Sequence, residues 1–259
     1  NRIIIDDVTI LDQMGKTMML SARIAAKIDV AALAKGRIVV NSAQLFSPRL
    51  TLYQTSAEAK PNFQFVLDSL ASKDTTSHKP LDIAVGSFIM RHADIHYDRY
   101  DKAPTKGKLD INHLAVSDFN LYAALPQLTD NTLELAVREL SFKEQSGIDI
   151  RRLAFHFRAD RRKAVLSDFT LEMPASKLLI PSLTASYRHD GKNIIAATVK
   201  FDGTIEQSFV TPADMAFILP SLHTFHDKLF IASSFIGTGT SVNIGSFVVN
   251  SPSGDINID

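Results

Sequence analysis

The chain has 259 residues, 45% of them hydrophobic, which is enough for a large core in one β unit or in two ordinary domains. Lys plus Arg and Asp plus Glu number 28 each, and this balance argues against binding to nucleic acid through net charge. The absence of Cys excludes disulfides and thiolate metal sites. No apolar run reaches the roughly 18 residues of a membrane helix, and no signal peptide is visible.

The first elements along the chain are a short helix and a strand. Asp29 before Val30 and Gly36 after Lys35 are the capping and stop signals of a one-turn helix. A strand pattern follows from Ile38. Apolar residues at spacing three and four after Pro61 then predict a short helix near 61–71.

The strand pattern at Ile38 recurs at Ile83, Leu135 and Val242. Each copy has three apolar pairs at spacing two, with a slip of phase between the first pair and the second. The first two copies align without a gap, 45 residues apart; their pairs are Ile38/Val40, Ala43/Leu45, Leu50/Leu52 and Ile83/Val85, Phe88/Met90, Ile95/Tyr97.

The phase slip predicts a local distortion of each strand. A slip of one residue turns side chains to the opposite face of a sheet unless a bulge corrects it. We therefore expect bends near Asn41, Gly86, Arg138 and Gly245.

A second pattern, an Asp followed by two apolar residues at spacing two, recurs out of step with the first, beginning at Asp7, Asp118 and Asp168. Repetition of this kind indicates a solenoid or a stacked array. Bent strands stacked in one direction would form a trough with the apolar pairs on its concave face. The predicted fold is therefore mainly β, an elongated, curled antiparallel sheet of repeated strands that encloses a groove, with two or three short helices.

The second half of the chain continues with hairpins and one more helix signal. Alternating apolar residues from Leu153 to Phe157 and from Val165 to Met173 flank a polar connection at 159–162, which predicts an antiparallel hairpin. Asp190 before Gly191 favours a tight hairpin turn. Thr211, Pro212 and Asp214 predict a helix near 211–226, which Pro220 should end or kink.

The densest cluster of possible metal ligands is His92, Asp94, His96, Asp98 and Asp101. On a strand, His92 and His96 would lie about 13 Å apart, too far to share one metal ion. No Walker loop, dinucleotide fingerprint or nucleophile elbow is present. We therefore predict no catalytic residue, no metal site and no cofactor, and a protein that is not an enzyme.

Basic residues gather around the predicted hairpin. The run comprises Arg151, Arg152, Arg158, Arg161, Arg162 and Lys163. Arg side chains match phosphate oxygens, so the run suits contact with lipid headgroups or phosphate. The alternative is a solvated hairpin tip whose charge is balanced by acids elsewhere.

Several segments resemble the TamB branch of the AsmA-like superfamily, in their order more than in any single motif. These are 36–40 (GRIVV), 50–53 (LTLY), 62–65 (NFQF), 112–114 (NHL), 140–147 (LSFKEQSG) and 166–169 (LSDF). The resemblance covers nearly the whole chain and points to a region fairly close to the anchored N-terminus of such proteins.

The resemblance implies a location and a function. Proteins of this kind are long, anchored in the inner membrane, and cross the Gram-negative periplasm as a β-taco around an apolar groove. It thus implies phospholipid transport between the two membranes. Some members pair, through a C-terminal region, with an outer-membrane barrel of the assembly-factor type. We expect residues 1–259 to be one continuous, repeat-built groove segment of a longer protein.

The expected groove lining follows from the apolar pairs, with the face of each strand still to be decided: Ile38, Val40, Leu50, Leu52, Ile83, Val85, Ile95, Leu135, Val137, Phe155, Phe157, Val165, Phe169, Leu171, Val242 and Ile244. The same alternation also occurs inside a filled sandwich or barrel. Two alternatives to lipid transport therefore stay open. One is a periplasmic scaffold or chaperone-like factor for outer-membrane protein assembly that pairs its strand edges with client strands, and the other is a structural β-array.

Overall fold

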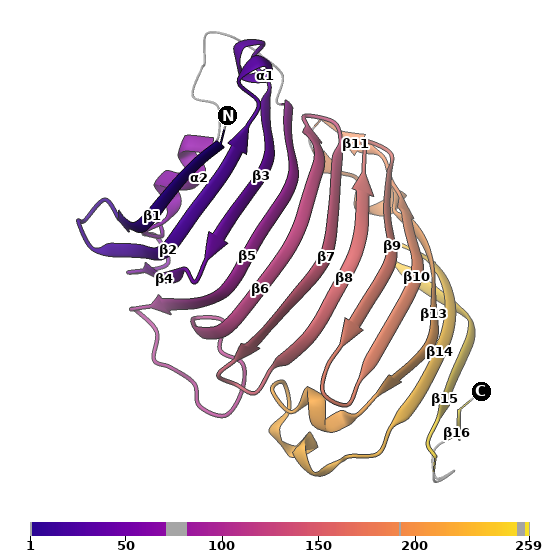
Figure 1. Cartoon of the computed structure of the whole chain (residues 1–259). Coiled ribbons are helices and arrows are strands. Elements are labelled where there is room, and N and C mark those ends of the chain that lie inside the picture. Colours follow the sequence, from indigo (N-terminus) through magenta and orange to yellow (C-terminus); the bar gives the residue numbers. More distant parts are fainter. Residues whose placement is uncertain (1, 71–81, 192, 253–256, 259) are drawn as a thin grey trace.

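The computed structural model describes residues 2–70, 82–191, 193–252 and 257–258, and is dominated by a 14-stranded, mostly antiparallel, curled sheet (Figure 1). The expected fold class is confirmed. Its strands are β1 (Arg2–Leu11), β2 (Thr17–Ile28), β3 (Ile38–Phe46), β4 (Arg49–Gln54), β5 (Asp82–Arg99), β6 (His113–Thr129), β7 (Leu133–Glu144), β8 (Asp149–Ala159), β9 (Lys163–Glu172), β10 (Lys177–Ser186), β13 (Lys200–Val210), β14 (Leu229–Thr238), β15 (Ser241–Asn250) and β16 (Asn257–Ile258).

Strands follow one another across the sheet in chain order, with β3 and β4 lying end to end between β2 and β5. A separate hairpin of β11 (His189–Asp190) and β12 (Asn193–Ile194) turns at Gly191, as expected from its Asp-Gly pair. The hairpin of β8 and β9 is also confirmed.

Two of the expected helices are present. In α1 (Val30–Ala34) the Asp29 carboxylate accepts the amide hydrogen of Ala32 at 3.0 Å, and Gly36 follows with φ of 78°. The helix expected near 61–71 is α2 (Gln64–Leu70); residue 71 lies outside the described residues.

The segment expected to be helical near 211–226 holds two short 3₁₀ helices, η2 (Pro212–Met215) and η3 (Pro220–Thr224), in place of one helix interrupted at Pro220. The Thr211 hydroxyl, expected as a cap, instead donates to the Ala175 carbonyl at 2.7 Å, and the Asp214 carboxylate accepts the Ala175 amide. These bonds hold the start of the segment against the β9–β10 turn, and Pro220 begins a new turn where a continuous helix would have needed its amide.

The gapless repeat of 45 residues is realised as parallel pairing in register. Ile38 pairs with Ile83 on β5 and Leu50 pairs with Ile95, so one offset holds for both β3 and β4. This parallel step interrupts an otherwise antiparallel sheet. Two repeats thus lie side by side with equivalent residues adjacent.

The strands carry bulges where the phase slips. Register shifts lie at or opposite Asn41, Gly86, Arg138 and Gly245, which confirms all four expected bends. The second sequence pattern also marks a backbone feature, because its three Asp residues share the left-handed conformation. The φ angles of Asp7, Asp118 and Asp168 are 52°, 49° and 54°.

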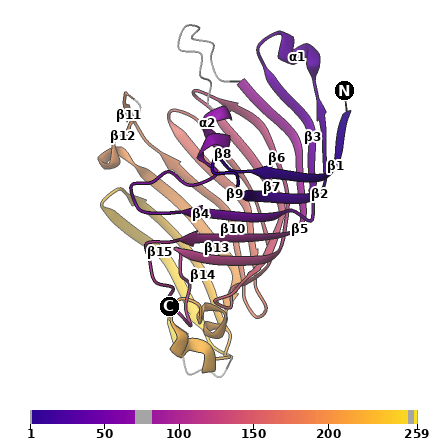
Figure 2. The same cartoon turned by 90° about the vertical axis from the view of Figure 1, so that its left-hand side faces the viewer.

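In the described part of the chain the large sheet is a single layer, and the only other sheet there is the hairpin of β11 and β12. Helix α2 lies on the concave side of the N-terminal strands (Figure 2). The accessible surface is 16108 Å², whereas a compact globular protein of this size exposes about 11,000 Å². Figure 2 shows how the strands bend along their length, which makes the layer a trough.

Candidate functional site

Paired residues of neighbouring strands share a face of the sheet, so the register assigns each side chain to one face. One continuous row, named here the leucine row, crosses nine strands through direct pairs. It consists of Ile5, Ile24, Leu45, Met90, Leu121, Leu140, Leu153, Leu171 and Leu178. Every member is aliphatic.

A second row, named the rim row, runs near the edge of the sheet that carries the β8–β9 turn. It consists of Ile38, Ile83, Leu128, Leu133, Ala159, Ala164, Ala185, Phe201, Gly237 and Val242. No polar side chain interrupts it.

The two rows belong to the same face. Phe155 lies two residues from Leu153 in the leucine row, and Phe157 lies two residues from Ala159 in the rim row. Between the rows, Phe157 pairs with Leu166, while Phe155 stacks on Phe169 with ring centroids 6.4 Å apart. The whole width between the rows is therefore apolar on β8 and β9, and we call this side of the sheet the apolar face.

The opposite side, the polar face, has a different composition. A line of direct pairs there joins Glu134, Arg158, Val165, Thr184 and Asp202. Arg158 and Asp202 are exposed to solvent. The sheet thus presents one water-compatible face and one apolar face.

The bulges explain why the sheet curls toward the apolar face. A bulge adds a residue to one strand. Here each bulge consists of two residues that lie on the polar face, and the apolar residues on either side of them are three positions apart in the sequence. Such pairs are Asn41 and Ser42, Gly86 and Ser87, Arg91 and His92, Ser117 and Asp118, Pro126 and Gln127, Arg138 and Glu139, Arg151 and Arg152, Ser167 and Asp168, Gly245 and Ser246. The extra length on the polar face places the apolar face inside the bend.

Side chains of the apolar face are half-buried by one another. From Ile24 to Leu178, every member of the leucine row has intermediate exposure. At its N-terminal end, on the edge strand β1, Ile5 is 53% exposed. In the rim row, the ends Ile38 and Val242 are 42% and 58% exposed. The wall of the trough is therefore in contact with solvent along its length.

One polar side chain continues the leucine row, and its polar atom is satisfied. Ser208 on β13 is 1% exposed, and its hydroxyl accepts the Leu179 amide hydrogen at 2.9 Å and donates to the Glu206 carbonyl at 3.1 Å. Beyond it, the direct pairs Ser208–Ile231 and Ile231–Val249 restore the apolar character. The hydroxyl is directed to the backbone and leaves the wall without a free polar group here.

Fifteen of the sixteen expected lining residues lie on the apolar face. They are Ile38, Val40, Leu50, Leu52, Ile83, Val85, Ile95, Leu135, Val137, Phe155, Phe157, Phe169, Leu171, Val242 and Ile244. The exception is Val165, which pairs with Arg158 and Thr184 on the polar face. The bulge at Asp168 shifts the phase of β9, so that Leu166 takes the place expected for Val165.

Sequence reasoning missed several members of the rows, among them Leu121, Leu128, Leu178 and Phe201. Their strands did not belong to a recognised copy of the repeat. A signal was nevertheless present, because apolar residues alternate along stretches of each of these strands. Only the register shows which of them continue a row.

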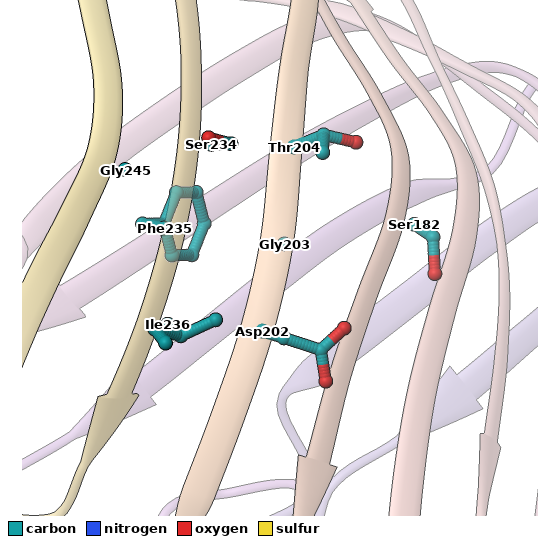
Figure 3. Close-up of a pocket in the computed structure, with 8 residues that line it drawn as sticks. All are labelled: Ser182, Asp202, Gly203, Thr204, Ser234, Phe235, Ile236 and Gly245. Carbon is teal, nitrogen blue, oxygen red and sulfur yellow. The ribbon is translucent and has the colours of Figure 1, made fainter.

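A small hollow lies in the C-terminal part of the sheet, where Figure 3 shows the residues around Gly203. Its volume is about 290 Å³, and it is lined by Ser182, Asp202, Gly203, Thr204, Ser234, Phe235, Ile236 and Gly245. Asp202, Thr204 and Ile236 belong to the polar face. At the lower end of the size range of ligand pockets, this hollow is too small and too open to compete with the apolar face.

The histidine and aspartate cluster on β5 forms pairwise contacts. The Nδ1 atom of His92 lies 2.9 Å from Asp118, and the His113 Nδ1 atom lies 2.9 Å from Asp98. The hydrogen bond from His92 is the main cause of a lowered pKa of Asp118, and the bond to Asp98 raises the pKa of His113. Within the described residues, no group of three such side chains is arranged to hold a metal ion.

No helix in the described residues is long and apolar enough to span a membrane. Comparisons with models of known protein families, with curated proteins and with solved structures find no match for the chain.

Proposed function

We propose that this chain is a periplasmic segment of an inner-membrane-anchored, TamB-like protein of the AsmA-like superfamily, and that its apolar face carries phospholipid between the inner and outer membranes. The observation that supports the proposal is the leucine row, an unbroken line of aliphatic side chains from Ile5 to Leu178 that no second sheet of the described residues covers. An outer-membrane barrel of the assembly-factor type remains the proposed partner of the whole protein.

The rows have the length and direction that an acyl chain needs. Nine strands at about 4.8 Å spacing extend the leucine row over about 38 Å, which exceeds the about 30 Å of a bilayer core that holds two opposed acyl layers. The row runs across the strands, along the axis of the trough. A lipid on it would therefore move from strand to strand in an unchanged environment.

The energetics fit a carrier with weak selectivity for the acyl chain. Each methylene moved from water to an apolar wall gains about 0.8 kcal/mol, so a partly sheltered chain gains several kcal/mol without any polar contact. Ser208 does not offer a polar trap, because its hydroxyl is bonded to the backbone. A smooth wall of this kind binds lipid and still lets it slide.

The test is native mass spectrometry with lipid extraction on the purified protein and two sets of variants. Val85→Asp with Phe155→Asp places charge on the apolar face. The matched control is Val165→Asp, which makes the same chemical change on the polar face beside Arg158. Circular dichroism checks that each variant keeps its β content.

We expect phospholipid to copurify with the wild type and the Val165→Asp control, and to be lost from the variant of the apolar face. A lipid-free wild type, under conditions in which a known carrier retains lipid, would refute the proposal. Equal loss from both variants would show that lipid does not lie on the apolar face.

The edge strand β1 favours a second candidate function, pairing with client strands during outer-membrane protein assembly. In the described part of the chain, β1 pairs only with β2, and Ile3, Ile4 and Ile5 are 48%, 46% and 53% exposed. An open apolar edge of this kind accepts an added strand. Crosslinking from position 4 to an unfolded barrel protein, with a lipid-free apolar face, would favour this function over lipid transport.

A further inference from the structure

Cationic side chains gather at one edge of the trough, beside the rim row. The turn between β8 and β9 contributes Arg161 and Arg162, Lys163 begins β9, and Arg188 follows β10. All four side chains belong to exposed residues. This cluster, named the basic rim, stands out in a chain whose formal net charge is zero.

The nearest carboxylate in the turn is already engaged by the backbone. Asp160 accepts the amide hydrogens of Arg162 at 2.7 Å and of Lys163 at 2.9 Å, and these two bonds are the main cause of its lowered pKa. It therefore shapes the turn. None of the four cations of the basic rim forms an ion pair with any residue that the structure describes.

Among the described residues, the guanidinium of Arg161 bonds to two neutral acceptors. Its two terminal nitrogens lie 3.3 Å from the Asn131 side-chain oxygen and 3.3 Å from the Gly191 carbonyl. The guanidinium is thus held between three neighbouring turns by neutral groups. An anion at this edge would supply a charged partner.

Aromatic residues fix the backbone of the turn. The Tyr187 hydroxyl donates to the Asp160 carbonyl at 2.8 Å, and the Tyr187 amide donates to the Arg162 carbonyl at 2.9 Å. A His189 ring nitrogen lies 2.8 Å from the Arg161 carbonyl. The cations therefore project from a braced turn, which lowers the entropy lost when they bind a ligand.

The wall beneath the basic rim is apolar and has unusually small side chains. Ala159, Ala164 and Ala185 are direct neighbours in the rim row, with Leu133 before them and Phe201 after them. Three adjacent alanines leave space on the wall between two large side chains. The turn that carries the basic rim thus borders a part of the apolar wall with small side chains.

We propose that the basic rim binds the phosphate of an anionic phospholipid whose acyl chains lie over the three alanines. The inference rests on the proposed function and adds headgroup selectivity at one edge of the trough. A zwitterionic headgroup carries its own cation, which the cations of the basic rim repel, so a lipid with net negative charge is preferred.

The experiment measures binding of four probes to the full chain: phosphatidylglycerol, phosphatidylcholine and diacylglycerol with the same acyl chains, and inorganic phosphate. The main variant is Arg162→Gln with Lys163→Gln, whose side chains form no hydrogen bond with described residues and leave the bracing intact. The matched control is Arg151→Gln with Arg152→Gln, on β8 away from the turn. Arg162→Lys tests whether charge alone suffices.

We expect the wild type to prefer phosphatidylglycerol over phosphatidylcholine by about fivefold for each cation in contact, a preference that falls as salt is added. The main variant should lose about 5-fold to 25-fold in affinity for phosphatidylglycerol while binding diacylglycerol as before. The control pair and Arg162→Lys should keep the preference.

The outcomes separate this inference from the proposed function. If diacylglycerol binds and the wild type shows no headgroup preference, the basic rim is not a headgroup site, although the groove stands. If no lipid binds, the proposed function fails. Inorganic phosphate that binds as tightly as phosphatidylglycerol would assign the basic rim to a free anion and overturn the lipid site.

Discussion

A Cβ atom at Gly86 would lie 2.7 Å from the carbonyl oxygen of Asn41, closer than real Cβ contacts permit. The two residues hold equivalent positions, 45 residues apart, in adjacent copies of the repeat, and both lie in bulges. The parallel strands β3 and β5 thus approach so closely at the bulge that position 86 must lack a side chain.

Gly86→Ala should destabilise the protein by about 1–3 kcal/mol, because the added methyl group meets backbone that cannot move without shifting β3. Gly245→Ala is the control, since its nearest neighbour is the Ser234 side-chain oxygen at 3.0 Å, which can rotate away. Urea unfolding followed by circular dichroism measures both. A loss at Gly245 as large as that at Gly86 would contradict the role of the Asn41 carbonyl.

Asp168 should tolerate Gly better than Ala. Its φ of 54° costs an L-residue without a stabilising side chain about 1–2 kcal/mol, and Gly has no such cost. We expect Asp168→Ala to be less stable than Asp168→Gly by about 1 kcal/mol. At Asp202, a strand position without positive φ, the order should reverse. Thermal unfolding of the four variants decides, and the same order at both positions would refute the explanation.

Stability should depend on pH through the hydrogen bond of 2.7 Å from the Tyr53 hydroxyl to Asp12. Burial alone would raise the pKa of Asp12, but the bonds from Tyr53, Lys16 and Met14 outweigh it and lower that pKa. The same bond raises the pKa of Tyr53 to about 12. The contribution of Asp12 is therefore lost as pH falls below about 4, and that of Tyr53 is lost as pH rises from about 10 to 12.

Tyr53→Phe should lower the midpoint of thermal unfolding at neutral pH. It should also remove the decline that this midpoint shows in the wild type between about pH 10 and 12. Tyr100→Phe is the control, because Tyr100 stacks on Tyr53 with centroids 5.1 Å apart and leaves the bond to Asp12 in place. Thermal scans from acid to alkaline pH give the midpoints. An unchanged alkaline decline in Tyr53→Phe would assign that decline to other groups.

Ser208→Ala should cost about 1–3 kcal/mol, although it makes the continuation of the leucine row onto β13 apolar. The substitution leaves the Leu179 amide hydrogen without its side-chain acceptor. Ser233→Ala removes only a hydroxyl that donates to the carbonyl of the exposed Ser246, so its cost should be smaller. Equal or greater stability of Ser208→Ala in urea unfolding would show that the hydroxyl is dispensable.

Local geometry was predictable from the sequence where a pattern changed phase. The bends at Asn41 and Gly86 follow from the slip between apolar pairs, because a strand with one buried face must restore that face. The parallel pairing of β3 with β5 was not predicted, although the gapless offset of 45 residues between the two copies is also the offset between the paired residues. The assignment of Val165 failed because β9 has its own bulge at Asp168, and nothing in a single strand shows where the phase changes.

The openness of the sheet could not be predicted from alternation alone. The same residues would alternate in a filled sandwich, and the difference lies in whether a second layer faces Leu121 or Leu153. Likewise, Thr211 is of a residue type that often caps a helix. Only its contact with Ala175, 36 residues earlier, shows that its hydroxyl donates to that carbonyl instead.

Because the bulged pairs lie on the polar face, the curvature of the trough and the chemistry of its apolar wall depend on different residues. Curvature depends on residues such as Gly86 and Asp168, whose backbone geometry bends the strand, whereas the apolar wall is formed by residues such as Leu121 and Phe155 on the other side. The width of the trough and the chemistry of its wall are therefore determined by different positions. Substitutions among aliphatic residues change the surface of the wall while the shape of the trough is kept.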